Sequence, residues 1–141
     1  MKFILFEMAE RRKEIARWLS SNSMPVMEHL VKYLCVNDKD MREHWIDEIY
    51  GFLHTVDLIK GSNKYPTKEF IVDNTYGKHA DSICLKRNKI LKKYNDSTLV
   101  ELSDEKLLDF ILYYFQHLSE YLSYDGYVSE DEVRDILTSY K

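Results

Sequence analysis

The chain has 141 residues, of which 45% are hydrophobic and 31% are charged. This length and balance suit one folded domain, residues 1–141, and they exclude a disordered chain. Two cysteines exclude a disulfide framework, and four glycines with two prolines leave too few turn signals for a sandwich or barrel of short strands. These features predict an all-α fold, a single compact bundle of six or seven helices.

The N-terminal quarter predicts two helices. Apolar residues at helical spacing indicate a first helix over residues 3–20, and the polar cluster Ser20 to Ser23 ends it. The apolar stretch from Lys2 to Phe6 also fits a short strand. Pro25 suits the first turn of a second helix that runs to Cys35.

A third helix is predicted between Asp40 and Ile59. Asp40 is a good N-cap with Glu43 three residues later, and Gly61 is the expected stop. The apolar residues between these signals repeat at helical spacing, which gives the segment one face for a core.

The middle of the chain predicts two further helices. Thr67 follows a proline and opens a short fourth helix, and Gly77 separates it from a fifth helix that reaches Tyr94. The polar stretch 95–98 then reads as a loop.

The sixth predicted helix is the centre of the bundle. Ser103 caps it, and the segment of about 104–122 is apolar on almost all sides, as in a helix surrounded by others. A turn at Asp125 and Gly126 leads to Ser129, which opens the last helix with a capping box.

No segment predicts membrane insertion or secretion. The longest apolar run, Leu107 to Phe115, is about half of what a bilayer-spanning helix needs, and Asp109 interrupts it. The apolar run after Met1 is too short for a signal peptide. We therefore expect a cytoplasmic protein, in which Cys35 and Cys84 are buried, reduced thiols.

Charge is distributed unevenly along the chain. Residues 1–100 hold 17 Lys and Arg against 14 Asp and Glu, whereas residues 101–141 hold 3 against 10, so the balances are +3 and −7. The acidic last third also carries six of the eleven tyrosines. Tyrosine is enriched at protein interfaces, and carboxylates steer a basic partner. We predict that Tyr121, Tyr124, Asp125 and Tyr127 bind a protein partner with a basic surface.

The same segment resembles the later half of an EF-hand calcium loop over residues 121–132. In that register Asp125 is a ligand, Gly126 makes the sharp turn and Glu132 is the closing carboxylate. The first ligand position falls on Tyr121, which departs from the pattern because it removes a carboxylate. An Asp-Gly turn followed by a helix cap explains the same residues without calcium.

A metal-dependent sensor or enzyme is the alternative hypothesis, using this loop or a cluster in the third helix. Asp47, His54 and Asp57 are spaced to share one face of that helix, where a carboxylate could orient an imidazole or share a metal. The same face is where a helix places its solvated residues. We therefore assign no catalytic residue, no metal ligand and no cofactor, and we favour a non-enzymatic interaction module of the inhibitor, immunity or adaptor type.

A basic run in the fifth helix raises the question of nucleic-acid binding. It consists of Lys86, Arg87, Lys89, Lys92 and Lys93, which we place on the polar side of the helix. The whole chain carries a net charge of −4, so a solvated helix face is favoured over a nucleic-acid surface.

Overall fold

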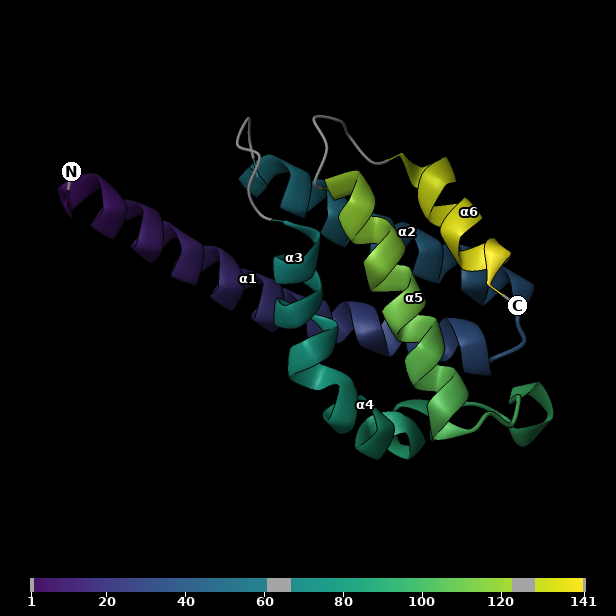
Figure 1. The fold of residues 1–141 in the computed structure, drawn as a ribbon. Helices are drawn as coiled ribbons and strands as arrows, with labels where there is room; N and C mark the ends of the chain where they lie inside the picture. Colours follow the sequence, from purple (N-terminus) through teal and green to yellow (C-terminus); the bar gives the residue numbers. More distant parts are fainter. Residues whose placement is uncertain (1, 61–66, 123–128, 141) are drawn as a thin grey trace.

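The computed structural model describes the backbone of residues 2–60, 67–122 and 129–140, and the side chains of 12–52, 67–120 and 129–140. In these residues the predicted all-α class is confirmed: helices α1 to α6 and one 3-10 helix pack as a compact bundle (Figure 1). The only β pairing described is one isolated bridge, between Val36 and Leu99.

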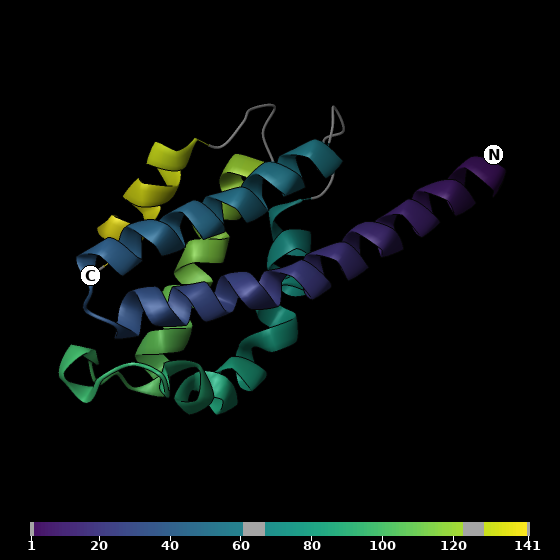
Figure 2. The same cartoon turned by 180° about the vertical axis from the view of Figure 1, so that it is seen from behind.

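Helix α1 (Lys2–Cys35) is continuous, so the predicted break between residues 20 and 25 is wrong, as is the alternative of a strand at Lys2 to Phe6. Buried residues continue through the expected break, from Leu19 to Ser23 and on to Val26. Packing along this face favours one helix over two. The first turns of α1 extend beyond the rest of the bundle (Figures 1 and 2).

Helix α1 contains a proline, Pro25, in its interior. Pro25 cannot donate to the carbonyl of Ser21, but both residues are exposed, so water can reach that carbonyl. In the preceding turn the Ser23 hydroxyl donates to the Ser20 carbonyl at 3.2 Å, and His79 Nε2 donates to the same carbonyl at 2.6 Å. Exposure of the Ser21 carbonyl to water therefore reduces the cost of the hydrogen bond that the proline removes.

Helix α2 (Lys39–Lys60) packs along α1 as the second arm of a helical hairpin (Figure 2). Its cap is Asp38, whose carboxylate accepts from the backbone N–H of Met41 at 3.1 Å, so the predicted cap at Asp40 is corrected by two residues. Trp45 and Ile49 on α2 are fully or almost fully buried. The predicted stop at Gly61 lies outside the described residues.

Helices α3 (Lys68–Asn74) and α4 (Tyr76–Leu91) meet at Thr75, not at Gly77. The predicted opening of this helix at Thr67 is confirmed, and the Thr67 hydroxyl caps α3 by accepting from the N–H of Phe70. Thr75 leaves helical geometry at φ −117° and ψ −90°, and its hydroxyl donates to the Ile71 carbonyl at 2.7 Å. Gly77 lies in the first turn of α4, so the hydroxyl of a buried threonine, and not a glycine, marks the boundary.

The predicted loop 95–98 contains the 3-10 helix η1 (Asp96–Thr98). Its far end is tied to the turn between α1 and α2. The N–H of Asn37 donates to the Thr98 carbonyl at 2.7 Å, and the N–H of Val100 donates to the Cys35 carbonyl at 2.8 Å. These bonds hold the segment leading into α5 against the α1–α2 hairpin.

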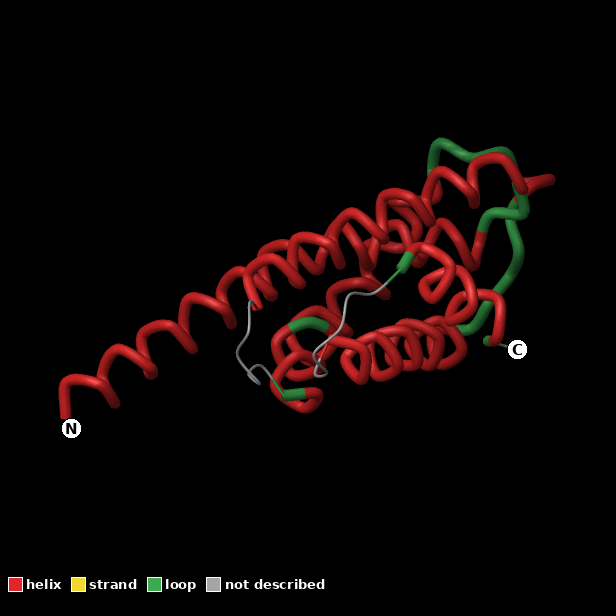
Figure 3. Tube along the Cα trace, turned by 90° about the horizontal axis from the view of Figure 1, so that it is seen from above, coloured by secondary structure: helices red, strands yellow, loops and turns green. Residues whose placement is uncertain are grey.

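Helix α5 (Asp104–Leu122) occupies the centre, as predicted for residues 104–122. The Ser103 hydroxyl accepts from the N–H of Lys106, and the helix packs against α1, α3, α4 and α6. Helix α6 (Glu130–Ser139) packs on α2 and α5, and its predicted cap is present because Ser129 accepts from the N–H of Glu132. Seen from above, the helix that begins at the N-terminus extends past the other helices (Figure 3).

Candidate functional site

The four tyrosine-segment residues predicted to bind a partner fall outside the described side chains. Tyr121 belongs to the last turn of α5, but its side chain is not described, and Tyr124, Asp125 and Tyr127 lie in the undescribed segment 123–128. The calcium-loop hypothesis is untested for the same reason. Of that loop, Ser129 and Glu132 are described, and both serve the start of α6.

The acidic helix that follows, α6, is anchored by one face and presents carboxylates on the other. Val133, Ile136 and Leu137 are buried against the bundle. Asp131 and Asp135 are exposed. Because α6 lies on α2, its Glu130 and Arg134 reach Asp47 and Glu43 on that helix.

The resulting surface, here called the carboxylate face, joins two helices. It consists of Glu43 and Asp47 on α2 and Glu130, Asp131 and Asp135 on α6. Within it Arg134 Nη2 lies 2.6 Å from Glu43 Oε2 and 3.8 Å from Glu130 Oε1. A hydrogen bond with Asp47 raises the pKa of Glu130 above its ordinary value. The cause is the nearness of a second carboxylate, so negative charges are crowded where α6 meets α2.

The remaining tyrosines of the last third pack inward. Tyr114 is fully buried, as its spacing on the central helix predicts. Tyr140, placed after the last helix, folds back on α5, with ring centroids 5.0 Å from Phe110 and 5.3 Å from Tyr113. These contacts fix the C-terminal end of α6, so Tyr140 supports the position of the carboxylate face.

The predicted Asp-His cluster is only partly described. Asp47 is exposed on the carboxylate face, while the side chains of His54 and Asp57 lie outside the described set. Among the described residues, no group of three or more potential metal ligands is close enough to hold an ion.

The basic run divides between two roles. Arg87 does not lie on the polar side as predicted: its side chain is 16% exposed, Nη1 donates to the Leu102 carbonyl at 2.7 Å, and Nη2 lies 2.7 Å from Asp104 Oδ1. Arg87 therefore ties α4 to the start of α5. The lysines of the run, Lys86, Lys89, Lys92 and Lys93, are exposed.

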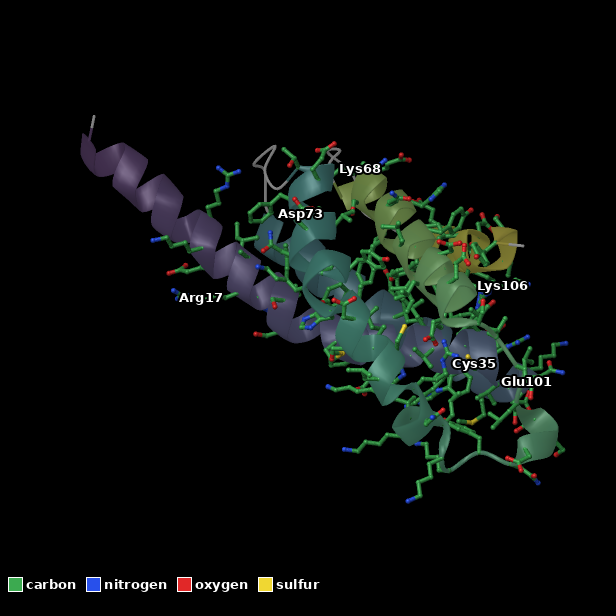
Figure 4. The ribbon with its side chains drawn as sticks, turned by 60° about the horizontal axis from the view of Figure 1, so that its bottom comes forward. Arg17, Cys35, Lys68, Asp73, Glu101 and Lys106 are labelled. Atoms are coloured by element: carbon green, nitrogen blue, oxygen red, sulfur yellow. The ribbon has the colours of Figure 1, made fainter. Side chains whose placement is uncertain are left out.

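The two cysteines are free, but only Cys35 is fully buried; Cys84 is partly exposed, which corrects the prediction of two buried thiols. Burial raises the pKa of both thiols, and the nearby Arg87 opposes that rise. Thiols with raised pKa are poor nucleophiles. Figure 4 places Cys35 among the packed side chains.

Sequence reasoning missed a group of charged residues between α1 and α2. The pKa of His29 is lowered, first by burial and then by Lys32 on the next turn, while Glu48 and Glu28 oppose the shift. His29 Nδ1 is buried without a hydrogen-bond partner among the described residues. Nothing in the spacing of His29 signals this, because its surroundings come from the packing of two helices.

Comparison with known protein families, curated proteins and solved structures finds no match for this chain. Among the described residues, no helix is long and apolar enough to span a bilayer.

Proposed function

We propose that this chain is a non-enzymatic protein-interaction module, of the inhibitor, immunity or adaptor type, whose acidic end docks on a basic protein surface. The observation that carries the proposal is the carboxylate face. Its five acidic side chains come from two packed helices, with Arg134 beside Glu43 and Glu130, and Glu130 beside Asp47. A cationic partner would relieve that crowding.

Occlusion of the partner is the proposed mechanism. Exposed carboxylates accelerate association with a basic surface, and buried aromatic side chains supply most of the affinity at such interfaces. Tyr124 and Tyr127 lie in the chain between α5 and the acidic helix α6, so they are the proposed anchors. Asp131 and Asp135 are the proposed steering charges.

Affinity capture of the tagged protein from its own cells at low ionic strength tests this function. Three forms are compared: the wild type, a Tyr124→Ala, Tyr127→Ala variant and an Asp131→Lys, Asp135→Lys variant. We expect a stoichiometric basic partner that both variants lose. The matched control, Glu14→Lys with Glu101→Lys, reverses two exposed carboxylates elsewhere and is expected to retain the partner.

Binding of the purified partner then separates the two contributions. Lysine substitutions at Asp131 and Asp135 should slow association and remove much of its salt dependence, whereas the tyrosine variant should speed dissociation. Capture of no partner, together with a melting temperature raised by calcium, zinc, magnesium or manganese, would instead support the metal-dependent alternative.

A further inference from the structure

A second charged surface lies on α4, at a distance from the carboxylate face. Leu85, Lys86, Lys89, Lys92 and Lys93 follow one another at helical spacing on one side of α4 and the residues just after it, and are here called the lysine face. No carboxylate occurs between residues 85 and 93. Nitrogen-tipped side chains extend outward from this end of α4 in Figure 4.

The lysine face is not neutralised by its own chain. In the part of the chain that the structure describes, none of its four lysines makes an ion pair. Lys93 instead lies close enough to Lys32 on α1 to help lower the pKa of that lysine, after the larger effect of burial. Like charges therefore repel across the edge of this face.

An apolar side chain lies among these lysines. Leu85 is 86% exposed, against 37% for Met41 and 43% for Val100, the other large exposed hydrophobic residues described. Leu85 offers an apolar contact beside charges, and protein interfaces combine an apolar centre with a polar rim. A phosphate backbone offers no comparable contact for it, and the net charge of −4 repels nucleic acid.

The complementary surface is present on the same chain but out of reach within one copy. Helix α4 packs on α1, α3 and α5, whereas α6 packs on α2 and α5. Figures 1 and 2 show α4 and α6 at separate edges of the bundle, with α5 between them. Opposite charges that cannot meet within a molecule favour contact between molecules.

We propose that the lysine face of one copy docks on the carboxylate face of a second copy, with Leu85 as the apolar contact. This arrangement is head to tail, because the two surfaces differ. However many copies join, a lysine face stays free at one end and a carboxylate face at the other. Oligomers should therefore grow beyond dimers as the protein concentration rises. The carboxylate face would then be covered in the oligomer and available at the end of each chain of copies.

Sedimentation velocity over a range of protein concentrations tests the proposal, at low ionic strength and at about 1 M salt, where charges are screened beyond roughly 3 Å. The wild type should self-associate at low ionic strength and dissociate at high salt. Two variants, Lys89→Glu with Lys92→Glu and Asp131→Lys with Asp135→Lys, should each weaken self-association by about tenfold or more. Leu85→Ser should weaken it without changing the charge.

Mixing the two charge-reversed variants gives the decisive comparison, because it pairs an acidic α4 face with a basic α6 face. We expect the mixture to associate although neither variant does so alone. The control, Arg17→Glu with Lys106→Glu, changes the net charge as much as the lysine-face variant and alters exposed positions away from that face (Figure 4). It should associate like the wild type, and circular dichroism establishes that each variant is folded.

Three results would overturn the proposal: a wild type that stays monomeric at low ionic strength, a control that loses association as fully as the lysine-face variant, or a mixture that does not recover it. Retention of a fluorescent DNA or RNA oligonucleotide by the lysine face, lost in the Lys89→Glu, Lys92→Glu variant, would assign this face to nucleic acid instead. The proposal uses the same carboxylate face as the proposed function but does not rest on that function, because self-association of the purified protein is measured without the other partner.

Discussion

The hydroxyl of Tyr114 is a polar group that the core does not satisfy. Tyr114 is fully buried on α5, its hydroxyl has no hydrogen-bond partner among the described residues, and burial raises its pKa well above the ordinary value. An unsatisfied buried polar group costs about 1–3 kcal/mol. We expect Tyr114→Phe to raise the free energy of unfolding by about 1 kcal/mol in urea denaturation, since the ring is kept.

Tyr140→Phe is the matched control for this substitution. The Tyr140 hydroxyl donates to the Lys106 carbonyl at 3.5 Å, near the limit of a hydrogen bond, and it is not fully buried. Its removal should change stability little. A Tyr114→Phe protein less stable than the wild type would mean that the hydroxyl has a partner in solution.

His29 makes stability depend on pH. Its pKa in the folded protein lies below the ordinary value of 6.5 because burial and Lys32 disfavour the charged ring, despite Glu28 and Glu48; His44 adds a small effect in the same direction as burial. The unfolded chain therefore takes up the proton first as the pH falls through 6.5, and the folded state loses stability toward the lower folded pKa.

The measurement is the free energy of unfolding from about pH 8 to pH 5, the range in which histidine titrates. The wild type should lose more stability on acidification than a His29→Gln variant, which lacks the titrating ring. Parallel curves for the two proteins would show that His29 keeps its ordinary pKa in the fold.

At the level of elements, α1 shows that packing can override a helix-breaking residue. Pro25 in a helix interior costs about 3 kcal/mol, and its rigidity in the unfolded chain returns roughly 0.4–1 kcal/mol. Pro25 is exposed, so Pro25→Ala removes no core contact and lets residue 25 donate to the Ser21 carbonyl. We expect the alanine variant to gain about 2 kcal/mol of stability, measured by urea unfolding.

Ser21→Ala serves as its control, because that change also places alanine at an exposed position of the same helix but adds no backbone hydrogen bond. Little gain is expected there. Equal stability of the wild type and Pro25→Ala would mean that the helix bends enough at this point to lose its bond in either sequence.

The elements that sequence predicted well have local causes. The caps at Thr67, Ser103 and Ser129 depend on a side chain and an N–H three residues later, and all three are present. The errors occurred where distant contacts decide. The expected break before Pro25 ignored the stripe that continues from Leu19 to Val26, which a longer window of periodicity would have revealed.

The candidate surfaces were predictable in charge but not in geometry. The excess of carboxylates in the last third is visible in the sequence, but the meeting of Glu130 with Asp47 requires α6 to pack on α2. Arg87 reads as one more cation of a basic run, and only the Leu102 carbonyl and Asp104 draw it inward. Contacts between residues far apart in sequence leave no periodic signal.

At the scale of the whole molecule, the acidic helix α6 is held by fewer neighbouring helices than the central helix α5. Among the described helices, the acidic helix α6 packs mainly on α2 and α5, whereas α5 packs on four other helices. The salt bridge from Arg134 on α6 to Glu43 joins partly exposed groups, and such pairs contribute about 0–1 kcal/mol to stability. The surface proposed to bind a partner is therefore carried by an element with few supports, as is common for binding elements.

This difference predicts that α6 opens before the rest of the bundle. Only three buried side chains of α6 anchor it to the bundle, Val133, Ile136 and Leu137. Little buried apolar surface therefore opposes the entropy that α6 gains when it opens. Native-state hydrogen exchange should give the amides of α6 a lower opening free energy than the amides of α5. The Ile83→Val variant then shows whether α6 opens alone or with the whole molecule.

Ile83 is fully buried on α4, which does not pack on α6, so Ile83→Val should lower the free energy of global unfolding by about 0.5–1.5 kcal/mol. If α6 opens alone, this substitution speeds exchange in α5 and leaves exchange in α6 unchanged. If both helices accelerate equally, α6 unfolds only with the whole molecule. In that case the carboxylate face is as rigid as the core, and partner binding would involve no ordering of α6.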